Sequence, residues 1–364
     1  MKKLDIKDLS QKKLSEWLTE HDVKPYRAGQ IFKWIYIHQA ESFDEMTDLG
    51  KSLRDLLKKH YTINRLEKSN IETSSDGTQK YLFRLEDGEH SECVLIPGSK
   101  GRLTLCISSQ VGCAQGCTFC LTAKGGFKRN LTTGEIVAQV RDLLNELPVE
   151  EGAPPTVKPF NNIVFMGMGE PLANLNNVTD ALEIITDADF GLKFSTRRIT
   201  VSTCGLVNRF EALANATNVN LAVSLNATDN KTRSELMPVN KIFPIEELIA
   251  ACKIFPMANR DKITFEYILM KGVNDSAGDA YRLVKLLTDV KAKINLIPFN
   301  EFPGSDYKRP TDKVISDFLQ ILLDNGFTAI IRKSKGQDIS AACGQLRANQ
   351  IQSTTSDTDE NENN

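Results

Sequence analysis

The run CAQGCTFC, residues 113–120, places Cys113, Cys117 and Cys120 in a Cys-x3-Cys-x2-Cys pattern. The next cysteines along the chain in either direction are Cys106 and Cys204. A structural zinc site normally closes with four protein ligands, whereas each of the four irons of a cubane iron–sulfur cluster needs one. Three thiolates would therefore leave one iron open for chemistry. The alternatives are a zinc site completed by one of the four histidines, or three cysteines that only pack together.

The composition fits a soluble globular chain. It has 364 residues, 41% of them hydrophobic and 25% charged, enough for one large domain and an appendage. No apolar run approaches a membrane span and the N-terminus has no apolar signal core, so we expect no membrane association and a cytoplasmic location. Three of the eight cysteines are bunched, which argues against a secreted disulfide framework.

Charge is nearly balanced, with a formal net charge of −2. Residues 351–364 carry four acids and no base, and we expect a disordered acidic tail there. Any nucleic-acid surface must then be a local patch. Candidates are the basic residues of KGGFKR (124–129), Lys193, Arg197, Arg198, Arg332, Lys333 and Lys335, although such runs are more often solvated faces.

The pattern of apolar residues changes along the chain. Residues 1–70 read as a helical, possibly RNA-binding domain, and residues 71–100 as a β-hairpin, with QKYLFRL and HSECVLIP joined by the turn EDGE. From 101 to 350, strand-like runs alternate with amphipathic helices, and Thr132 and Glu135 form a capping box before one of these. The strand-like runs are 103–109, 162–168, 198–203, 219–225, 263–270, 294–299 and 327–333. This alternation predicts an α/β fold with a parallel sheet, as a partial (β/α)6-type barrel or, alternatively, a doubly wound open sheet.

Polar and glycine-rich segments follow the predicted strands. Barrel enzymes build their sites from loops at the carboxyl ends of strands, so these segments should meet at one rim. A carboxylate such as Glu170 could accept a hydrogen bond from a cofactor's ammonium group, although a single loop charge is often only a cap. The segments are the cysteine run, GMGEP (167–171), 202–205, 224–226, Asn300 and SKGQDISAACGQLR (334–347).

At this point the chain resembles a known family, the bacterial dual-specificity RNA adenine-C2 methyltransferases, which are radical S-adenosylmethionine (SAM) enzymes. One departure is Asn226, where the family usually carries histidine. The resemblance rests on YRAGQIFKWIY (26–36), FDEMTDL (43–49), VGCAQGCTFC (111–120), FMGMGEP (165–171), SLNATDNKTRSELMPVNK (224–241), INLIPFN (294–300) and DISAACGQLR (338–347).

The resemblance implies a set of cofactors and their ligands. Cys113, Cys117 and Cys120 would hold a [4Fe-4S] cluster. Two SAM molecules would be used per turnover, with a flavodoxin-like protein as electron donor and 23S rRNA and tRNA as substrates. The SAM-binding residues would be Gly169, Glu170, Ser202, Ser224, Leu225, Asn226 and Asn300.

The resemblance also implies roles for two cysteines outside the cluster and one acid. The first SAM would methylate Cys343, and a radical from the second would take hydrogen from that methyl group. The methylene radical would add to adenine C2, an electron-poor carbon that cannot attack a sulfonium directly. Glu92 would accept the C2 proton, and Cys106 would release the product by attacking the Cys343 sulfur, which leaves a disulfide bond. From the residues alone, these cysteines could equally be small buried hydrophobes and Glu92 a solvated strand charge.

Three other functions are compatible with this sequence. A related enzyme type methylates adenine C8 of the same rRNA and confers antibiotic resistance. A zinc-containing RNA-binding protein would use the cysteines structurally. An electron carrier fits less well, because it needs neither an open iron nor ligand-binding loops.

Overall fold

The computed structural model describes residues 3–149, 157–258 and 261–346. The N-terminal region is mainly helical, with α1 (Gln11–Glu20), α2 (Arg27–Phe32), which continues as a π-helical turn (Lys33–Ile37), and α3 (Lys51–His60). The short strands β1 (Leu4–Asp5) and β2 (Tyr61–Thr62) pair in parallel, so the helical character expected up to residue 70 ends at His60.

The expected hairpin is present as β4 (Gln79–Arg84) and β5 (His90–Pro97), but it belongs to a larger sheet. A further strand, β3 (Glu67–Thr73), pairs with β4, and β5 pairs antiparallel with β6 (Leu103–Cys106). In its turn Gly88 has φ +85°, a left-handed conformation that glycine adopts without strain. The hairpin therefore extends the barrel sheet through β6.

A sheet of ten strands in the described residues organises the molecule, in the order β14-β13-β12-β11-β10-β9-β6-β5-β4-β3. Strands β6 and β9 to β14 run parallel. Their order follows the chain without the reversal that defines a doubly wound sheet, so the partial α/β barrel is confirmed and the doubly wound alternative is wrong. The strands not yet given are β9 (Asn162–Phe165), β10 (Ile199–Thr203), β11 (Asn220–Ser224), β12 (Ile263–Leu269), β13 (Ala292–Pro298) and β14 (Thr328–Ile331).

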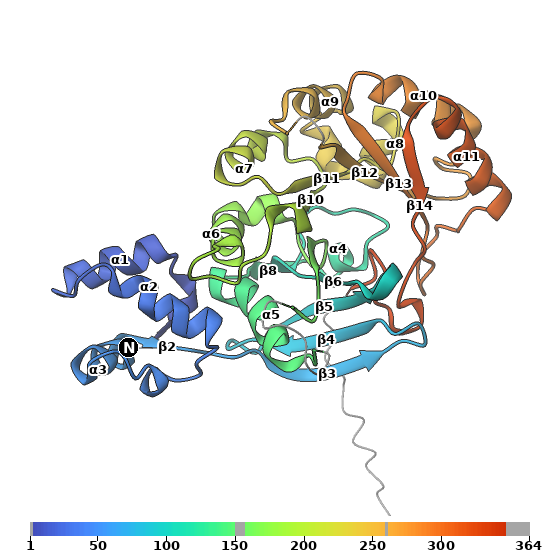
Figure 1. Cartoon of the computed structure of the whole chain (residues 1–364). Coiled ribbons are helices and arrows are strands. Elements are labelled where there is room, and N and C mark those ends of the chain that lie inside the picture. The colour runs from blue at the N-terminus through green and yellow to red at the C-terminus, as the bar shows by residue number, and fades with distance from the viewer. Residues whose placement is uncertain (1–2, 150–156, 259–260, 347–364) are drawn as a thin grey trace, which may run out of the picture.

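Helices cover the outer face of the curved parallel sheet (Figure 1). The expected capping box begins α5: Thr132 Oγ1 accepts from the Glu135 amide and the Glu135 carboxylate accepts from the Thr132 amide. Its apolar face is buried as expected. The helices are α4 (Leu121–Lys124), α5 (Thr133–Glu146), α6 (Leu175–Thr186), α7 (Phe210–Ala216), α8 (Asn230–Leu236), α9 (Ile245–Ile254), α10 (Ala277–Leu287) and α11 (Asp312–Asp324).

Buried polar contacts join the N-terminal region to α5. The Asp8 carboxylate accepts from the Gly134 amide in the first turn of α5 (2.7 Å). The buried Arg141 side chain donates to the carbonyls of Ile35 and Ala40. Among the described residues no helix is long and apolar enough to cross a membrane. The predicted acidic tail, 351–364, lies outside the described residues.

Candidate active site

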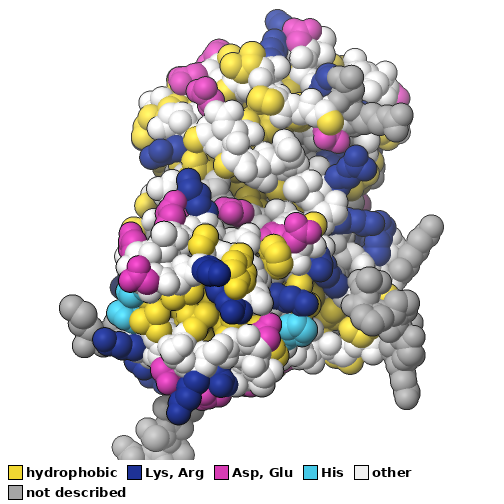
Figure 2. Space-filling model, turned by 60° about the vertical axis from the view of Figure 1, so that its left-hand side comes forward, with side chains coloured by type: hydrophobic (Ala, Val, Ile, Leu, Met, Phe, Trp, Pro, Cys, Tyr) yellow, Lys and Arg dark blue, Asp and Glu magenta, His cyan; other side chains and the backbone are white. Residues whose placement is uncertain are grey.

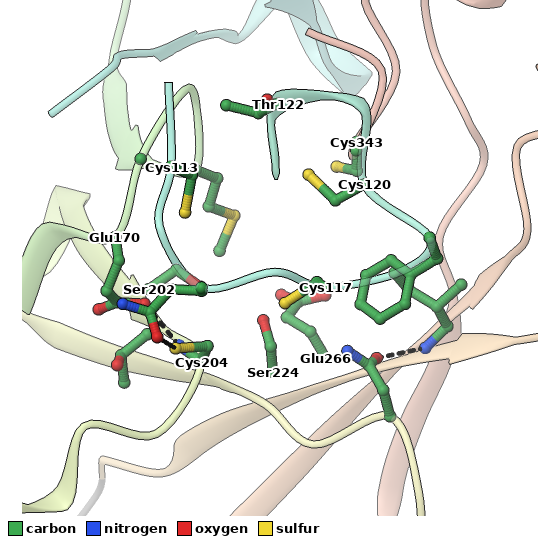
Figure 3. Close-up of a pocket in the computed structure, with 18 of the residues that line it drawn as sticks. Cys113, Cys117, Cys120, Thr122, Glu170, Ser202, Cys204, Ser224, Glu266 and Cys343 are labelled. Atoms are coloured by element: carbon green, nitrogen blue, oxygen red, sulfur yellow. Dashed lines mark hydrogen bonds between the residues drawn. The ribbon is translucent and has the colours of Figure 1, made fainter. Parts of the chain in front are cut away.

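A pocket of about 910 Å³ opens at the carboxyl ends of the parallel strands. It receives side chains from loops that lie far apart in the sequence, as expected for one rim (Figure 3). The predicted site residues that line it are Cys113, Cys117, Cys120, Gly169, Glu170, Ser202, Ser224, Asn226 and Cys343.

A small hairpin holds the cysteine run in place. Its strands are β7 (Gln110–Gly112) and β8 (Phe127–Asn130), and the run lies between them with α4. The Cys113 amide donates to the Gly126 carbonyl (3.0 Å) and the Thr118 amide to the Leu236 carbonyl (3.0 Å). The loop is therefore fixed to the hairpin at one side and to the end of α8 at the other.

The three thiols of the cysteine run line the same pocket. Figure 3 shows Cys113, Cys117 and Cys120 on different sides of a common space. Within the described ranges, no three His, Cys, Asp or Glu side chains are placed so that they could hold a metal ion between them. Three cysteine thiols around one space suit an iron–sulfur cluster, whose irons are bound by thiolates.

The electrostatics of these thiols also fit a metal cluster. Burial raises the pKa of Cys113 to about 12, and it raises the pKa of Cys117 together with the charges of the neighbouring thiolates. Without a positive partner both groups would stay protonated. Iron between them would stabilise the thiolate forms, which are the forms that bind metal.

The GMGEP segment crosses from β9 to the neighbouring strand ends. Gly169 has φ +98°, and a Cβ there would lie 2.5 Å from the Gln110 Cβ, so only glycine fits against β7. Glu170 is buried, and its two carboxylate oxygens accept from the amides of Leu172 (3.0 Å) and Cys204 (2.7 Å). Burial raises the pKa of Glu170, and these hydrogen bonds oppose that effect.

Asn226 ties β11 to the end of β12. Its φ is +57°, a left-handed conformation that asparagine tolerates better than most residues. Its side-chain oxygen accepts a hydrogen bond from the Ile268 backbone amide (2.9 Å), and its backbone carbonyl accepts one from the Asn274 side-chain amide (2.7 Å). Asn226 thus places a polar side chain in the pocket wall, and these hydrogen bonds fix the backbone there.

Two residues expected to bind SAM lie elsewhere. The Leu225 side chain is buried in the main hydrophobic core, and the Leu225 amide donates to the Glu266 carbonyl. Asn300 lines a second pocket, which is also lined by Arg332, Lys333 and Cys343. Successive side chains of an extended chain point to opposite faces. Because Ser224 points into the pocket, the side chain of Leu225 points into the core.

Cys343 and Cys106 lie near enough to interact electrostatically. Cys343 lines both pockets from the loop after β14. Cys106 is buried in a cluster with Val94 and Ala341, close to that loop. Burial and the charge of the Cys343 thiolate raise the pKa of Cys106 to about 12. All eight cysteines are free thiols, so the expected disulfide between Cys106 and Cys343 is absent from this structure. With its raised pKa, Cys106 is a protonated thiol here, and a protonated thiol is a poor nucleophile.

Glu92 is buried in β5 and lines neither of these two pockets. Its carboxylate lies 3.9 Å from the Lys80 Nζ, and Lys80 also donates to the Ile339 carbonyl (2.7 Å). Glu92 therefore shares an ionic contact with the lysine that binds the Cys343 loop. The solvated strand charge considered from the sequence is wrong.

Three pocket residues were missed or interpreted differently from the sequence. Cys204 was given no role of its own within the predicted segment 202–205, and it lines the pocket beside Glu170. Arg332, interpreted as a phosphate contact, lines both pockets, and the charge of the Cys343 thiolate raises its pKa. Glu266 is a buried acid in the apolar strand ITFEYIL, and that isolated charge was a signal in the sequence.

A partial α/β barrel with a Cys-x3-Cys-x2-Cys loop over a pocket at its strand ends defines a radical SAM enzyme. The model of the Radical SAM superfamily matches residues 107–284, and the model described as "Ribosomal RNA large subunit methyltransferase N-terminal domain" matches residues 4–63.

Similar proteins cover nearly the whole chain. The "Dual-specificity RNA methyltransferase RlmN" of Desulfosudis oleivorans is 58% identical over 94% of this chain and 91% of its own length. The protein of that name from Geobacter sulfurreducens is 54% identical over 94% and 92%. The crystal structure of a radical SAM methyltransferase from Sphaerobacter thermophilus superposes with a TM-score of 0.86 at 44% identity, over 95% of this chain and 100% of that one. The chain belongs to the RlmN family of radical SAM RNA methyltransferases.

Proposed function

We propose that this protein methylates C2 of specific adenines in 23S rRNA and in tRNAs through a methylated Cys343. The observation that carries this proposal is the position of Cys343. It lines the pocket that contains the three cluster cysteines and also a second pocket beside it. A thiol in this position can receive a methyl group on one side and meet a nucleotide on the other.

Cys113, Cys117 and Cys120 would hold a [4Fe-4S] cluster, and Gly169, Glu170, Ser202, Ser224 and Asn226 would surround SAM. When bound, these groups supply a methyl cation equivalent and a carbon radical, with two SAM molecules used per turnover. Leu225 would contribute through its backbone, because its side chain lies in the core. Asn300 would act from the boundary between the two pockets.

The chain's own residues would manage the charges on sulfur. Arg332 lines both pockets with Cys343, and the raised pKa of Arg332 keeps a positive charge beside the sulfur proposed to accept the methyl group. Burial keeps Cys106 as a thiol until it loses its proton to attack the Cys343 sulfur. Glu92 would take the C2 proton, which requires the adenine to come close to β5.

The second pocket is the proposed entrance for RNA. Arg332, Lys333 and Lys335 lie in its wall, and no carboxylate belongs to the described residues that line it. Such a wall suits phosphate groups, and the target adenine would have to be unstacked to enter. On the face in Figure 2, basic and acidic side chains are interspersed, which supports binding by local patches.

We further propose that residues 1–70 form an RNA-binding domain, followed by the hairpin extension 71–100 and the barrel 101–350. The flavodoxin-like electron donor and the cytoplasmic location belong to the same proposal. These assignments follow the RlmN family membership of the chain.

An anaerobic assay with reconstituted protein, SAM, a reductant and unmodified rRNA or tRNA tests the function. Nucleoside mass spectrometry should detect 2-methyladenosine. An 8-methyladenosine peak would assign the protein to the C8-methylating type. If protein that contains iron and cleaves SAM yields no methylated adenosine from either RNA, the proposed substrate is wrong.

A further inference from the structure

Two carboxylates belong to the described residues that line the main pocket, Glu170 and Glu266. They differ in how their oxygens are satisfied. Both oxygens of Glu170 accept hydrogen bonds from backbone amides. In Glu266, Oε1 accepts from the Asn295 side-chain amide (2.9 Å), whereas Oε2 is buried and has no hydrogen-bond partner. Glu266 therefore has an unused acceptor.

An unused acceptor at this position needs an explanation. Glu266 is only 5% exposed, and a buried carboxylate oxygen without a donor is unfavourable because it has lost its hydration and gained no hydrogen bond. Most buried polar atoms in native proteins have a partner, so an exception in the wall of a pocket points to a ligand. In Figure 3 the Glu266 side chain is drawn with those that surround the pocket, close to Ser224.

The neighbours of Glu266 indicate the kind of donor. Ser224 of β11 is its register partner in the parallel sheet, and both side chains line the pocket. Neighbouring strands are about 4.8 Å apart, so the Ser224 hydroxyl and the Glu266 carboxylate lie side by side. Such a pair can bind two adjacent hydroxyl groups of one ligand. Burial raises the pKa of Glu266, and the positive charge of Arg332 opposes that effect.

We propose that Glu266 binds the ribose of SAM, with its free oxygen accepting a hydrogen bond from a ribose hydroxyl beside Ser224. This inference rests on the proposed function. Carboxylates bind ribose hydroxyls in the same way in dinucleotide sites. RNA also has ribose hydroxyls, but Glu266 lines the pocket of the three cluster cysteines and does not belong to the wall of the second pocket.

The test measures SAM affinity of cluster-loaded protein by anaerobic equilibrium dialysis. Glu266→Leu removes both acceptor oxygens and should weaken SAM binding about tenfold or more. Glu266→Gln keeps the shape and should cause a smaller loss. The exposed Glu211 of α7 offers a matched control, and Glu211→Gln should bind SAM like the wild type. Iron content must be equal in all proteins.

A SAM analogue without the two ribose hydroxyls distinguishes a hydrogen bond between Glu266 and the ribose from a role of Glu266 in packing the pocket wall. Wild type and Glu266→Leu should bind this analogue equally. An equal loss of affinity for SAM and analogue in Glu266→Leu would mean a packing role and overturn the assignment. Unchanged SAM affinity would also overturn it, and a fall in RNA affinity alone would assign the acceptor to RNA. If cluster-loaded wild type did not bind SAM at all, the proposed function itself would fail.

Discussion

Replacing Gly112 by alanine should separate the cysteine run from its support. Gly112 directly precedes Cys113 and has φ +75°. A Cβ at this position would lie 1.8 Å from the Gly126 carbonyl oxygen and 2.9 Å from its carbon. The same carbonyl accepts the hydrogen bond from the Cys113 amide. The substitution therefore forces apart the two backbones that position the first proposed cluster ligand.

Gly126 supplies a matched control in the same hairpin. Its φ is +74°, but a Cβ there would have no heavy atom within 4 Å. Gly126→Ala should therefore cost only the left-handed backbone strain, about 1–2 kcal/mol in unfolding free energy. Gly112→Ala carries the same strain plus the clash with the Gly126 carbonyl, which must move by about 1 Å, for a total of about 3 kcal/mol or more.

The assay compares iron per chain after anaerobic reconstitution and the thermal midpoint of each variant. Gly126→Ala should keep the iron content of the wild type with a slightly lower midpoint. Gly112→Ala should lose iron and have a clearly lower midpoint. Equal iron content and equal midpoints in the two variants would refute the reasoning, because the only difference expected between them is the contact with the Gly126 carbonyl.

Three further predictions concern the loop that carries Cys343. Cys343→Ala should keep iron and SAM binding but produce no methylated RNA; methylation by this variant would exclude the two-thiol scheme. Cys106→Ala should accumulate protein joined to RNA, visible on a denaturing gel, and a gel without that species would count against Cys106 as the releasing thiol. For Asp76, burial raises the pKa, but hydrogen bonds from Thr78 and the Gly336 amide lower it to about 2. A folded-state pKa below the unfolded value of 3.8 adds stability above about pH 4 that disappears toward pH 2. The difference in thermal midpoint between wild type and Asp76→Asn should shrink over that range, and a constant difference would contradict the assignment.

The central strands β11 and β12 were predictable because most of their residues are buried and they read as nearly continuous apolar runs. The run predicted at 219–225 corresponds to the strand Asn220–Ser224, and the run predicted at 263–270 corresponds to the strand Ile263–Leu269. Strand β3 was not predictable in the same way. Its sequence EKSNIET has one large apolar residue and lies at the sheet edge, where pairing depends on β4.

In the site, too, features contained in a short stretch of sequence were predictable, whereas features that depend on how distant segments pack together were not. The cysteine run was recognisable because its ligand spacing is contained in eight residues. The position of Arg332 at both pockets depends on the path of the loop after β14, which no local pattern specifies. The unused acceptor of Glu266 appears only when the partners of both oxygens are known.

The hairpin extension has a role in the site that its sequence does not reveal. The Asp338 carboxylate accepts from the Ser74 hydroxyl (2.6 Å) and the Ser75 amide (3.1 Å), and Lys80 donates to the Ile339 carbonyl. These contacts hold the start of the Cys343 loop against β3 and β4.

The other side of the same loop is bound to the cysteine run. The Leu121 amide donates to the Gly344 carbonyl (2.8 Å), and the Thr122 hydroxyl donates to the Leu346 carbonyl (2.6 Å). Cys343 is therefore held between two supports, one on the hairpin and one next to the proposed cluster ligand Cys120. Because the supports are separate, loss of the hairpin contacts should displace Cys343 while the cluster loop keeps its own hydrogen bonds. The antiparallel strands thus position the thiol proposed to accept the methyl group, and the barrel positions the residues proposed to hold the cofactors.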